Sequence, residues 1–247
     1  MSFLSISMSV LGRALGYINE ENERNEIKAF IDTETTGLPR DDSHVVSIGV
    51  VFVQGCRVIQ TYYTLIKPSP GTQWPDSSPY HDVTNDEAMR TGIYIDAALE
   101  RIDELVRILD VRKMFAYNAQ FDHFMLTRDA GSSDRALLDL LKVPWFCVLK
   151  MVRKQSIPGR KSLVNVCKHF KITQSSEIAQ SSEISTSNFH NALYDAKMAW
   201  EVYRRLENQG DRESLKPRLQ FAIPGTCGRE TKKRTPCTLA IGCCHHH

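Results

Sequence analysis

The sequence lacks any apolar run of about 18 residues, which is the length that a helix needs to cross a bilayer. It also lacks a basic N-terminal region followed by a small-residue cleavage site, so residues 1–17 do not have the pattern of a secretory signal. An excess of charge of one sign is missing too, because the formal net charge is only +2. These absences predict an intracellular protein, in the cytoplasm or the nucleus, that does not use a membrane. Charge alone gives no case for nucleic-acid binding.

What is present is the composition of an ordinary globular protein, with 42% hydrophobic and 24% charged residues. The 247 residues suffice for one sizeable domain with a large core. We expect a leader over residues 1–26, a domain over 27–209 and a tail over 210–247. Within the domain, residues 173–187 are rich in Ser, Gln and Glu and contain Gln-Ser-Ser-Glu-Ile twice, which predicts a flexible insertion.

Short runs rich in β-branched and aromatic residues predict five strands, at residues 29–33, 45–53, 58–66, 114–117 and 145–150. Apolar residues at helical spacing predict helices at residues 95–109, 121–130, 162–170 and 191–206. Residues 68–79 contain four prolines and are expected to form a loop. Three consecutive strands, followed by strands that alternate with helices, predict an α/β fold with a mixed central sheet flanked by helices.

Asp32 and Glu34 stand two residues apart at the end of the first predicted strand. Side chains at this spacing on a strand point to the same face, so two carboxylates are placed side by side. Neighbouring carboxylates repel each other, and a divalent cation removes that conflict because it prefers oxygen ligands. The pair therefore indicates a metal site, although the same spacing also fits two solvated turn residues.

Three further residues of suitable chemistry follow in the chain. Asp122 comes after the strand at 114–117, where an acid in the first turn of a helix is also favoured by the helix dipole. His190 and Asp195 are five residues apart, which places them about 140° apart on a helix and therefore on different faces. Their spacing makes sense if His190 lies at or just before the start of the last helix while Asp195 lies within it.

Together these motifs resemble those of the DnaQ-like exonucleases of the DEDDh type. The matching runs are Asp-Thr-Glu-Thr-Thr-Gly at 32–37, Asn-Ala-Gln-Phe-Asp at 118–122 and His-Asn-Ala-Leu-Tyr-Asp-Ala at 190–196. Weaker similarities are His-Asp-Val-Thr at 81–84 and Pro-Gly-Arg-Lys-Ser-Leu at 158–163. The resemblance covers about residues 28–206. One departure is Phe-Cys-Val at 146–148, where the family usually carries Asp-Thr at a structural position.

The resemblance implies an RNase H-like fold and 3′→5′ hydrolysis of phosphodiester bonds in DNA or RNA, with release of nucleoside 5′-monophosphates. It also implies two Mg²⁺ or Mn²⁺ ions. Carried over residue by residue, Asp32 bridges both ions, Glu34 and Asp195 complete the first, and Asp122 supports the second. His190 is then the general base that takes a proton from the attacking water.

The implied partner is a nucleic acid with a free 3′ end. Backbone groups of Thr35 and Gly37, together with Leu38 against the terminal base and Asn118, would hold the last nucleotide. A polymerase or another replication or repair partner is not identifiable, because no polymerase-binding segment is recognisable. Alternatives stay open: a catalytically idle nucleic-acid-binding module of the same fold, an RNA-trimming activity like that of oligoribonucleases, or a recruitment factor. Idle relatives generally lose a carboxylate, whereas all four are present here.

The tail contains four of the seven cysteines and ends in three histidines. Structural zinc takes four such ligands, and Cys227, Cys237, Cys244 and His247 would supply them. Cys243 with His246 is an equally spaced alternative, and the stretch resembles small cysteine modules of phage and large-virus proteins. Terminal histidines are also typical of the remnant of a purification tag. The other three cysteines, Cys56, Cys147 and Cys167, lie in apolar segments and are expected to be reduced core residues.

Overall fold

A computed structural model describes residues 25–38, 43–72, 74, 81–130, 138–172 and 190–208 of the chain. It confirms the expected mixed sheet flanked by helices. The strands are β1 (Ile27–Thr35), β2 (Val45–Gln54), β3 (Arg57–Leu65), β4 (Lys113–Ala116) and β5 (Trp145–Cys147). They lie side by side in the order β3-β2-β1-β4-β5.

Strand β1 lies at the centre of the sheet. It pairs antiparallel with β2 and parallel with β4, and β2 pairs antiparallel with β3 while β4 pairs parallel with β5. The carboxyl ends of parallel strands meet at one edge of a sheet, and residues that follow them gather there. The end of β1, which carries the first motif, and the chain that leaves β4, which carries the second, therefore come together.

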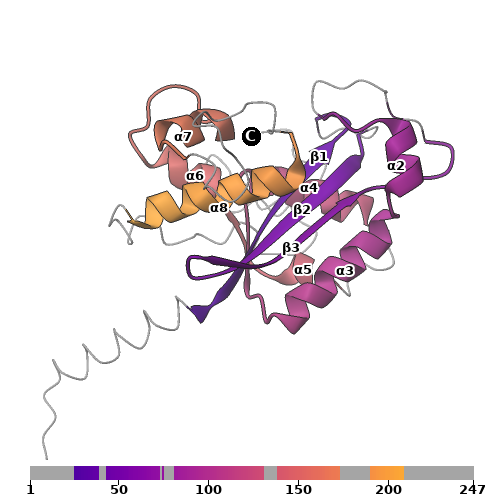
Figure 1. The fold of residues 1–247 in the computed structure, drawn as a ribbon, viewed down its shortest axis with the longest axis horizontal. Coiled ribbons are helices and arrows are strands. Elements are labelled where there is room, and N and C mark those ends of the chain that lie inside the picture. The colour runs from indigo at the N-terminus through magenta and orange to yellow at the C-terminus, as the bar shows by residue number, and fades with distance from the viewer. Residues whose placement is uncertain are drawn as a thin grey trace, which may run out of the picture.

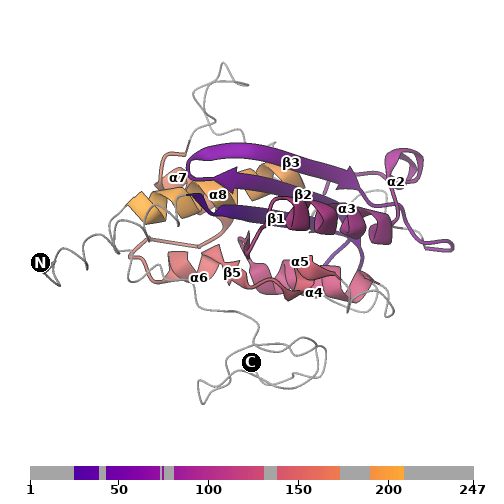
Figure 2. The ribbon, with the colours of Figure 1, turned by 90° about the horizontal axis from the view of Figure 1, so that it is seen from below.

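The helices are α2 (Asn85–Thr91), α3 (Ile95–Ile108), α4 (Ala119–Asp129), α5 (Asp139–Lys142), α6 (Val148–Arg153), α7 (Leu163–His169) and α8 (Ala192–Asn208). Helix α8 lies across one face of the sheet, against β1 and β2, with α6 and α7 beside it (Figures 1 and 2). Helices α3 and α4 cover the other face. The fold is therefore a sheet between two layers of helices.

Alternating side chains of the strands build a separate core on each face of the sheet. From β1, Ala29 and Ile31 pack toward α3 and α4, whereas Phe30 packs toward α6, α7 and α8. On the second face, the ring of Tyr203 from α8 lies 5.4 Å from that of Phe30 and 4.9 Å from that of Phe115 in β4. This alternation decides the direction of the next residues of β1, because Asp32 and Glu34 continue on the side of Phe30.

The structure corrects three details of the sequence interpretation. The predicted strand at 145–150 ends at Cys147, and its last three residues already belong to α6. Cys56 is exposed in the turn between β2 and β3, while Cys147 and Cys167 are buried and free as expected. The short helices α2 and α5 were not predicted, and contacts from outside them fix them: the Thr84 hydroxyl accepts from the Glu87 N–H, and the Asp103 carboxylate accepts from the Leu140 N–H.

Several expected segments lie outside the described residues. These are most of the leader over residues 1–26, the insertion at 173–187 and the tail over 210–247 with its candidate zinc ligands. Within the described part, no helix combines the length and the apolar character that crossing a membrane requires.

Candidate active site

The two carboxylates of the first motif lie on the α8 side of β1, near the end of the strand. Across the β1–β2 ladder, Asp32 is paired with Gly49 and Glu34 with Ser47. The register shifts directly after Glu34, so the regular ladder ends where the second carboxylate has been placed. The spacing of two residues therefore acts as predicted and directs both side chains to one face of the sheet.

The third carboxylate arrives from α8, and Gly49 makes this approach possible. A β-carbon built on Gly49 would lie 2.2 Å from the backbone nitrogen of Leu193 and 2.3 Å from the carbonyl carbon of Ala192. Atoms cannot approach so closely, so only glycine lets the first turn of α8 rest directly on β2. Because Gly49 is the ladder partner of Asp32, this contact brings Asp195 of the same helix next to Asp32.

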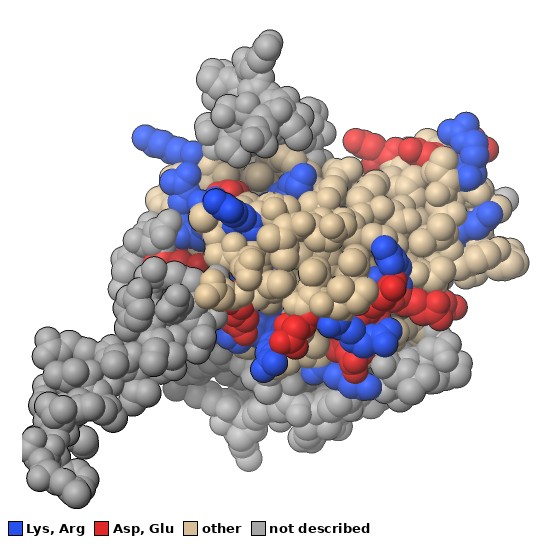
Figure 3. Space-filling model, turned by 60° about the horizontal axis from the view of Figure 1, so that its bottom comes forward, with Lys and Arg blue, Asp and Glu red and all other residues tan. Residues whose placement is uncertain are grey.

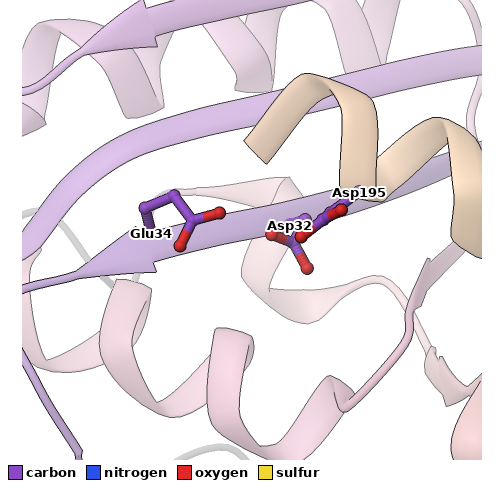
Figure 4. A group of neighbouring side chains, drawn as sticks. All are labelled: Asp32, Glu34 and Asp195. Carbon is purple, nitrogen blue, oxygen red and sulfur yellow. The ribbon is translucent and has the colours of Figure 1, made fainter. Parts of the chain in front are cut away.

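The result is a cluster of three carboxylates from β1 and α8 (Figure 4). One carboxylate oxygen each from Asp32, Glu34 and Asp195 can be chosen so that all lie within 4.8 Å of one another. Two oxygens at this place, Oε1 of Glu34 and Oδ1 of Asp195, are buried without a hydrogen-bond partner among the described residues. Burying an acceptor without a donor costs folding free energy. A hard divalent cation would remove this cost, because it binds carboxylate oxygens that point toward one place.

The electrostatics of the cluster agree with a site built around positive charge. Burial, followed by the charges of the neighbouring acids, raises the pKa of Asp32 well above its ordinary value. The same causes raise the pKa of Glu34 to about 8, with Asp195 the largest of the neighbouring charges. Burial raises the pKa of Asp195 to about 7, against the opposing effect of the His190 N–H. Without a cation, these carboxyl groups cannot all stay ionised near neutral pH.

Asp122 lies beside this cluster, in the first turn of α4. Its Oδ1 accepts hydrogen bonds from both the N–H (3.0 Å) and the hydroxyl (2.9 Å) of Thr33, the residue between the first two carboxylates. Burial raises the pKa of Asp122 to about 7, although the bonds from Thr33 oppose the shift and the charge of Asp195 adds to it. Asp122 therefore interacts electrostatically with the cluster, and one of its oxygens already accepts the hydrogen bonds from Thr33.

His190 stands outside α8, directly before its N-cap. Asn191 is that cap, because its Oδ1 accepts from the N–H of Tyr194 at 3.1 Å and its carbonyl accepts from the N–H of Asp195. His190 is exposed and has a left-handed backbone with φ of 74°, which is uncommon for a residue other than glycine. Its N–H donates to Oδ2 of Asp195 at 3.3 Å, so the backbone turn of the histidine is tied to a carboxylate of the cluster.

The four residues predicted to hold a terminal nucleotide lie on two segments. The Thr35 hydroxyl donates to the carbonyl of Gly37 at 2.7 Å and closes the turn after β1. Leu38, beyond this turn, is 56% exposed. Asn118 is exposed and precedes α4, and its side chain makes no capping bond to that helix. Thr35 itself is buried, and its hydroxyl is engaged within the turn.

Sequence reasoning missed three residues that position the site: Gly49, Thr33 and Asn191. A signal for Gly49 was present, because a lone glycine inside a run of β-branched residues often marks a close backbone approach. Thr33 and Asn191 lie within the two motifs but act through hydrogen bonds to residues far from them or one turn away. The partner of Thr33 is visible only in three dimensions, whereas an asparagine directly before a helix is itself a sequence signal for an N-cap.

The sequence of the domain is similar to that of known proteins. A family model described as an exonuclease, of the RNase T type, matches residues 29–203. A DNA polymerase III of the PolC type from Thermotoga maritima is 33% identical over 96 residues, which are 39% of this chain. The match spans only 7% of that much longer protein.

Solved structures share the fold at low sequence identity. One is the nuclease domain of 3′hExo, described as a DEDDh family member bound to rAMP, with a TM-score of 0.59 and 13% identity. The alignment covers 81% of this chain and 98% of the 3′hExo nuclease domain. Another is exonuclease X in complex with 5′-overhanging duplex DNA, with a TM-score of 0.53, 20% identity and coverage of 74% and 92%. From the match of the family model over most of the domain, the chain belongs to the DnaQ-like family of exonucleases.

Proposed function

We propose that this chain is a 3′→5′ exonuclease that removes nucleoside 5′-monophosphates from the free 3′ end of DNA or RNA. The observation that carries the proposal is the cluster of Asp32, Glu34 and Asp195, whose oxygens converge within 4.8 Å on the end of a central strand. Membership of the exonuclease family supports hydrolysis of a phosphodiester. The solved relatives named for a 3′-exonuclease support the polarity.

The carboxylates fit divalent cations, because Oε1 of Glu34 and Oδ1 of Asp195 are buried acceptors for which the described part of the chain offers no donor. We infer that Asp32, Glu34 and Asp195 hold one Mg²⁺ or Mn²⁺, and that Asp32 and Asp122 serve a second. Bound there, the ions would lower the pKa of water and offset the charge that develops on the phosphate. Asp122 has one oxygen engaged by Thr33 and keeps the other for this role.

His190 is the proposed general base. It is exposed at the start of α8, and its backbone is held toward the cluster by the bond from its N–H to Asp195. From this position the imidazole can take a proton from water at the phosphate and release it to solvent. A left-handed conformation costs about 1–3 kcal/mol for a non-glycine residue. Such strain is often found where a side chain must be presented in a particular direction.

The terminal nucleotide would lie over the turn that follows β1. We propose that backbone groups of Thr35 and Gly37 bind it, that Leu38 packs against its base, and that Asn118 contacts it from the start of α4. The exposed side chain of Leu38 supports this arrangement, because an isolated exposed leucine beside a polar site gives a nucleobase an apolar contact.

A time course with single-stranded DNA and RNA, each labelled at the 3′ or the 5′ end, tests the proposal directly. With Mg²⁺ or Mn²⁺, a 3′→5′ exonuclease releases labelled mononucleotide at once from the 3′-labelled strand and a ladder of shortened strands from the 5′-labelled one. EDTA should stop both. Binding without any cleavage under all metal conditions would instead support an idle nucleic-acid-binding module.

A further inference from the structure

Charged side chains are spread unevenly over the molecule. On the face drawn in Figure 3 they gather toward the ends and the lower edge, and the middle carries no Lys, Arg, Asp or Glu. The strongest excess of one sign of charge lies in residues 148–172, which form α6, α7 and the loop between them. This segment contains seven Lys or Arg and no Asp or Glu. The whole sequence, by contrast, has nearly equal numbers, 31 basic and 29 acidic residues.

Seven basic residues outside this segment form ion pairs with a neighbouring acid. These ion pairs join Arg101 with Glu104, Arg107 with Asp103, Arg112 with Asp110, Lys113 with Glu26, Arg128 with Asp129, Lys142 with Asp139 and Arg204 with Glu201. By contrast, Arg153, Arg160 and Lys168 are exposed, and none of them pairs with an acid among the described residues. Positive charge that no neighbouring acid neutralises is the feature that a polyanion recognises.

The segment is attached to the candidate active site at several points. The Tyr117 hydroxyl donates to the carbonyl of Lys161 at 2.5 Å, and the Tyr117 carbonyl accepts from the N–H of Leu149 at 2.9 Å. Tyr117 directly precedes Asn118 and the helix that carries Asp122. Helix α7 packs on α8, where the charge of Asp195 contributes to raising the pKa of the Cys167 thiol, after burial as the larger cause.

The loop between α6 and α7 is held in a defined shape rather than left to solvent. The Lys161 ammonium donates to the carbonyls of Ile157 and Gly159, so this lysine closes the loop on itself. Ile157 is buried in the core beneath, and Gly159 turns the chain with φ of 73°. Arg160 is therefore presented from a fixed turn, directly before the residue whose carbonyl Tyr117 binds.

We propose that the surface of residues 148–172, which we call the α6–α7 basic surface, binds the phosphate backbone of the strand that leads into the active site. The inference rests on the proposed function, because it assigns a path to the same substrate. Exposed, unpaired cations suit phosphates, which every nucleotide offers in DNA and RNA alike. The surface therefore contributes affinity that grows with strand length and does not depend on base sequence.

The test compares two double variants of the full chain with equal loss of charge. Arg153→Ala/Arg160→Ala changes the α6–α7 basic surface, and Arg57→Ala/Arg90→Ala removes two exposed arginines outside it. Binding of labelled 20-nucleotide DNA and RNA is measured by fluorescence anisotropy in EDTA at several salt concentrations, so that no cleavage is needed. In Arg153→Ala/Arg160→Ala we expect Kd to rise about tenfold. The slope of log K against log salt should become shallower by about 1.4, because each of the two lost phosphate contacts on a single strand contributes ~0.7.

Kinetics provide the second measurement. With Mg²⁺, the KM of Arg153→Ala/Arg160→Ala for a 20-nucleotide strand should rise about tenfold, whereas its KM for a dinucleotide should change less than twofold. Equal salt slopes in the two double variants would overturn the proposal, as would displacement of the oligonucleotide by polyglutamate of equal length and concentration. A wild-type chain that binds through this surface but never cleaves would refute the proposed function and leave the surface intact.

Discussion

Gly49 of β2 and Leu193 of α8 meet through their backbones, at a place where a β-carbon on the glycine would lie 2.2 Å from the nitrogen of Leu193. The distance between sheet and helix is thus set by peptide groups. Since Gly49 faces Asp32 across the ladder and Leu193 lies two residues before Asp195, the same contact sets the separation of two proposed metal ligands.

Substitution of Gly49 should therefore impair the site more than the fold. In Gly49→Ala, the first turn of α8 must move outward until the new methyl group reaches an ordinary contact distance. We expect the Mg²⁺ concentration for half-maximal activity to rise at least tenfold and turnover to fall about 10²-fold, because a displacement of about 1 Å can cost that much. Titration of activity with Mg²⁺ gives both values.

Ile102→Val, which removes one methylene group from the core on the opposite face of the sheet, controls for general destabilisation. A Gly49→Ala protein with the wild-type Mg²⁺ requirement would contradict this account.

Removal of a carboxylate should separate activity from stability. Asp32→Ala and Asp195→Ala are expected to abolish metal-dependent cleavage while the fold persists. Without metal, the Tm of either variant should equal or exceed that of the wild type, because a source of repulsion has gone. Activity assays with calorimetry in EDTA check both parts. Cleavage within a few fold of the wild-type rate would refute the assignment of these residues.

The raised pKa values predict how the metal-free protein responds to pH. Glu34, Asp122 and Asp195 have pKa values of about 8, 7 and 7 when folded, above the ordinary values of 4.5, 3.8 and 3.8. Between these limits the folded chain binds more protons than the unfolded chain, so its free energy of unfolding falls as pH rises from about 4 to about 8. Each extra proton held corresponds to about 1.4 kcal/mol per pH unit.

Thermal unfolding in EDTA across this pH range measures the effect. Asp195→Asn should flatten the profile because it removes one of the titrating groups. Saturating Mg²⁺ or Mn²⁺ should restore stability, most strongly near pH 8, where the ligands are ionised. A metal-free Tm that rises between pH 5 and pH 8 would contradict the proposed balance of protons.

Substitution of His190 should slow chemistry without loss of the metal. We expect His190→Ala to lower turnover by about 10²–10⁴. His190→Asn is the matched variant, because asparagine tolerates a left-handed backbone better than most residues and keeps the geometry at φ of 74°. If both variants lose turnover equally and still bind Mn²⁺ like the wild type, the imidazole is the cause. A normal rate in His190→Asn would show instead that only the backbone matters.

The tail over residues 210–247 is predicted to bind one zinc ion through Cys227, Cys237, Cys244 and His247. Four basic residues between its first two cysteines would then form a compact surface for phosphates. Elemental analysis of protein purified without a nickel column tests the zinc directly. Salt-dependent oligonucleotide binding by the full chain and by a chain that ends at residue 208 tests the surface. No stoichiometric zinc, with equal salt slopes, would leave only a solvated end with a tag remnant.

The sequence predicted the parts of the molecule that depend on local spacing. Two carboxylates two residues apart on a strand share a face, and a histidine five residues before Asp195 lies outside the helix, as found. The catalytic and substrate roles assigned to these residues stay predictions. The run 145–150 was misassigned because a short apolar stretch fits a strand and a buried helix equally well. Cys56 was placed in the core because its neighbours are apolar, whereas a turn with Gly55 at φ of 57° exposes it.

The remaining features could not be predicted because they join residues that are distant in the chain. Gly49 and Leu193 are brought together only when α8 lies down on β2, and no pattern near either residue names the other. The same holds for the Tyr117 hydroxyl and the carbonyl of Lys161, which attach the α6–α7 basic surface to the site.

The two hydrogen bonds from Thr33 to Asp122 leave the four carboxylates with different freedom to rotate. Among the described residues, Asp122 accepts two hydrogen bonds through one oxygen and Asp195 accepts one from the His190 N–H, whereas Oε1 of Glu34 accepts none. We therefore expect Asp122 to keep its orientation when a cation enters, and Glu34 to adapt its position to the radius of that cation. Discrimination between the smaller Mg²⁺ and the larger Mn²⁺ should therefore depend on Glu34, and loss of the Thr33 hydroxyl should weaken it.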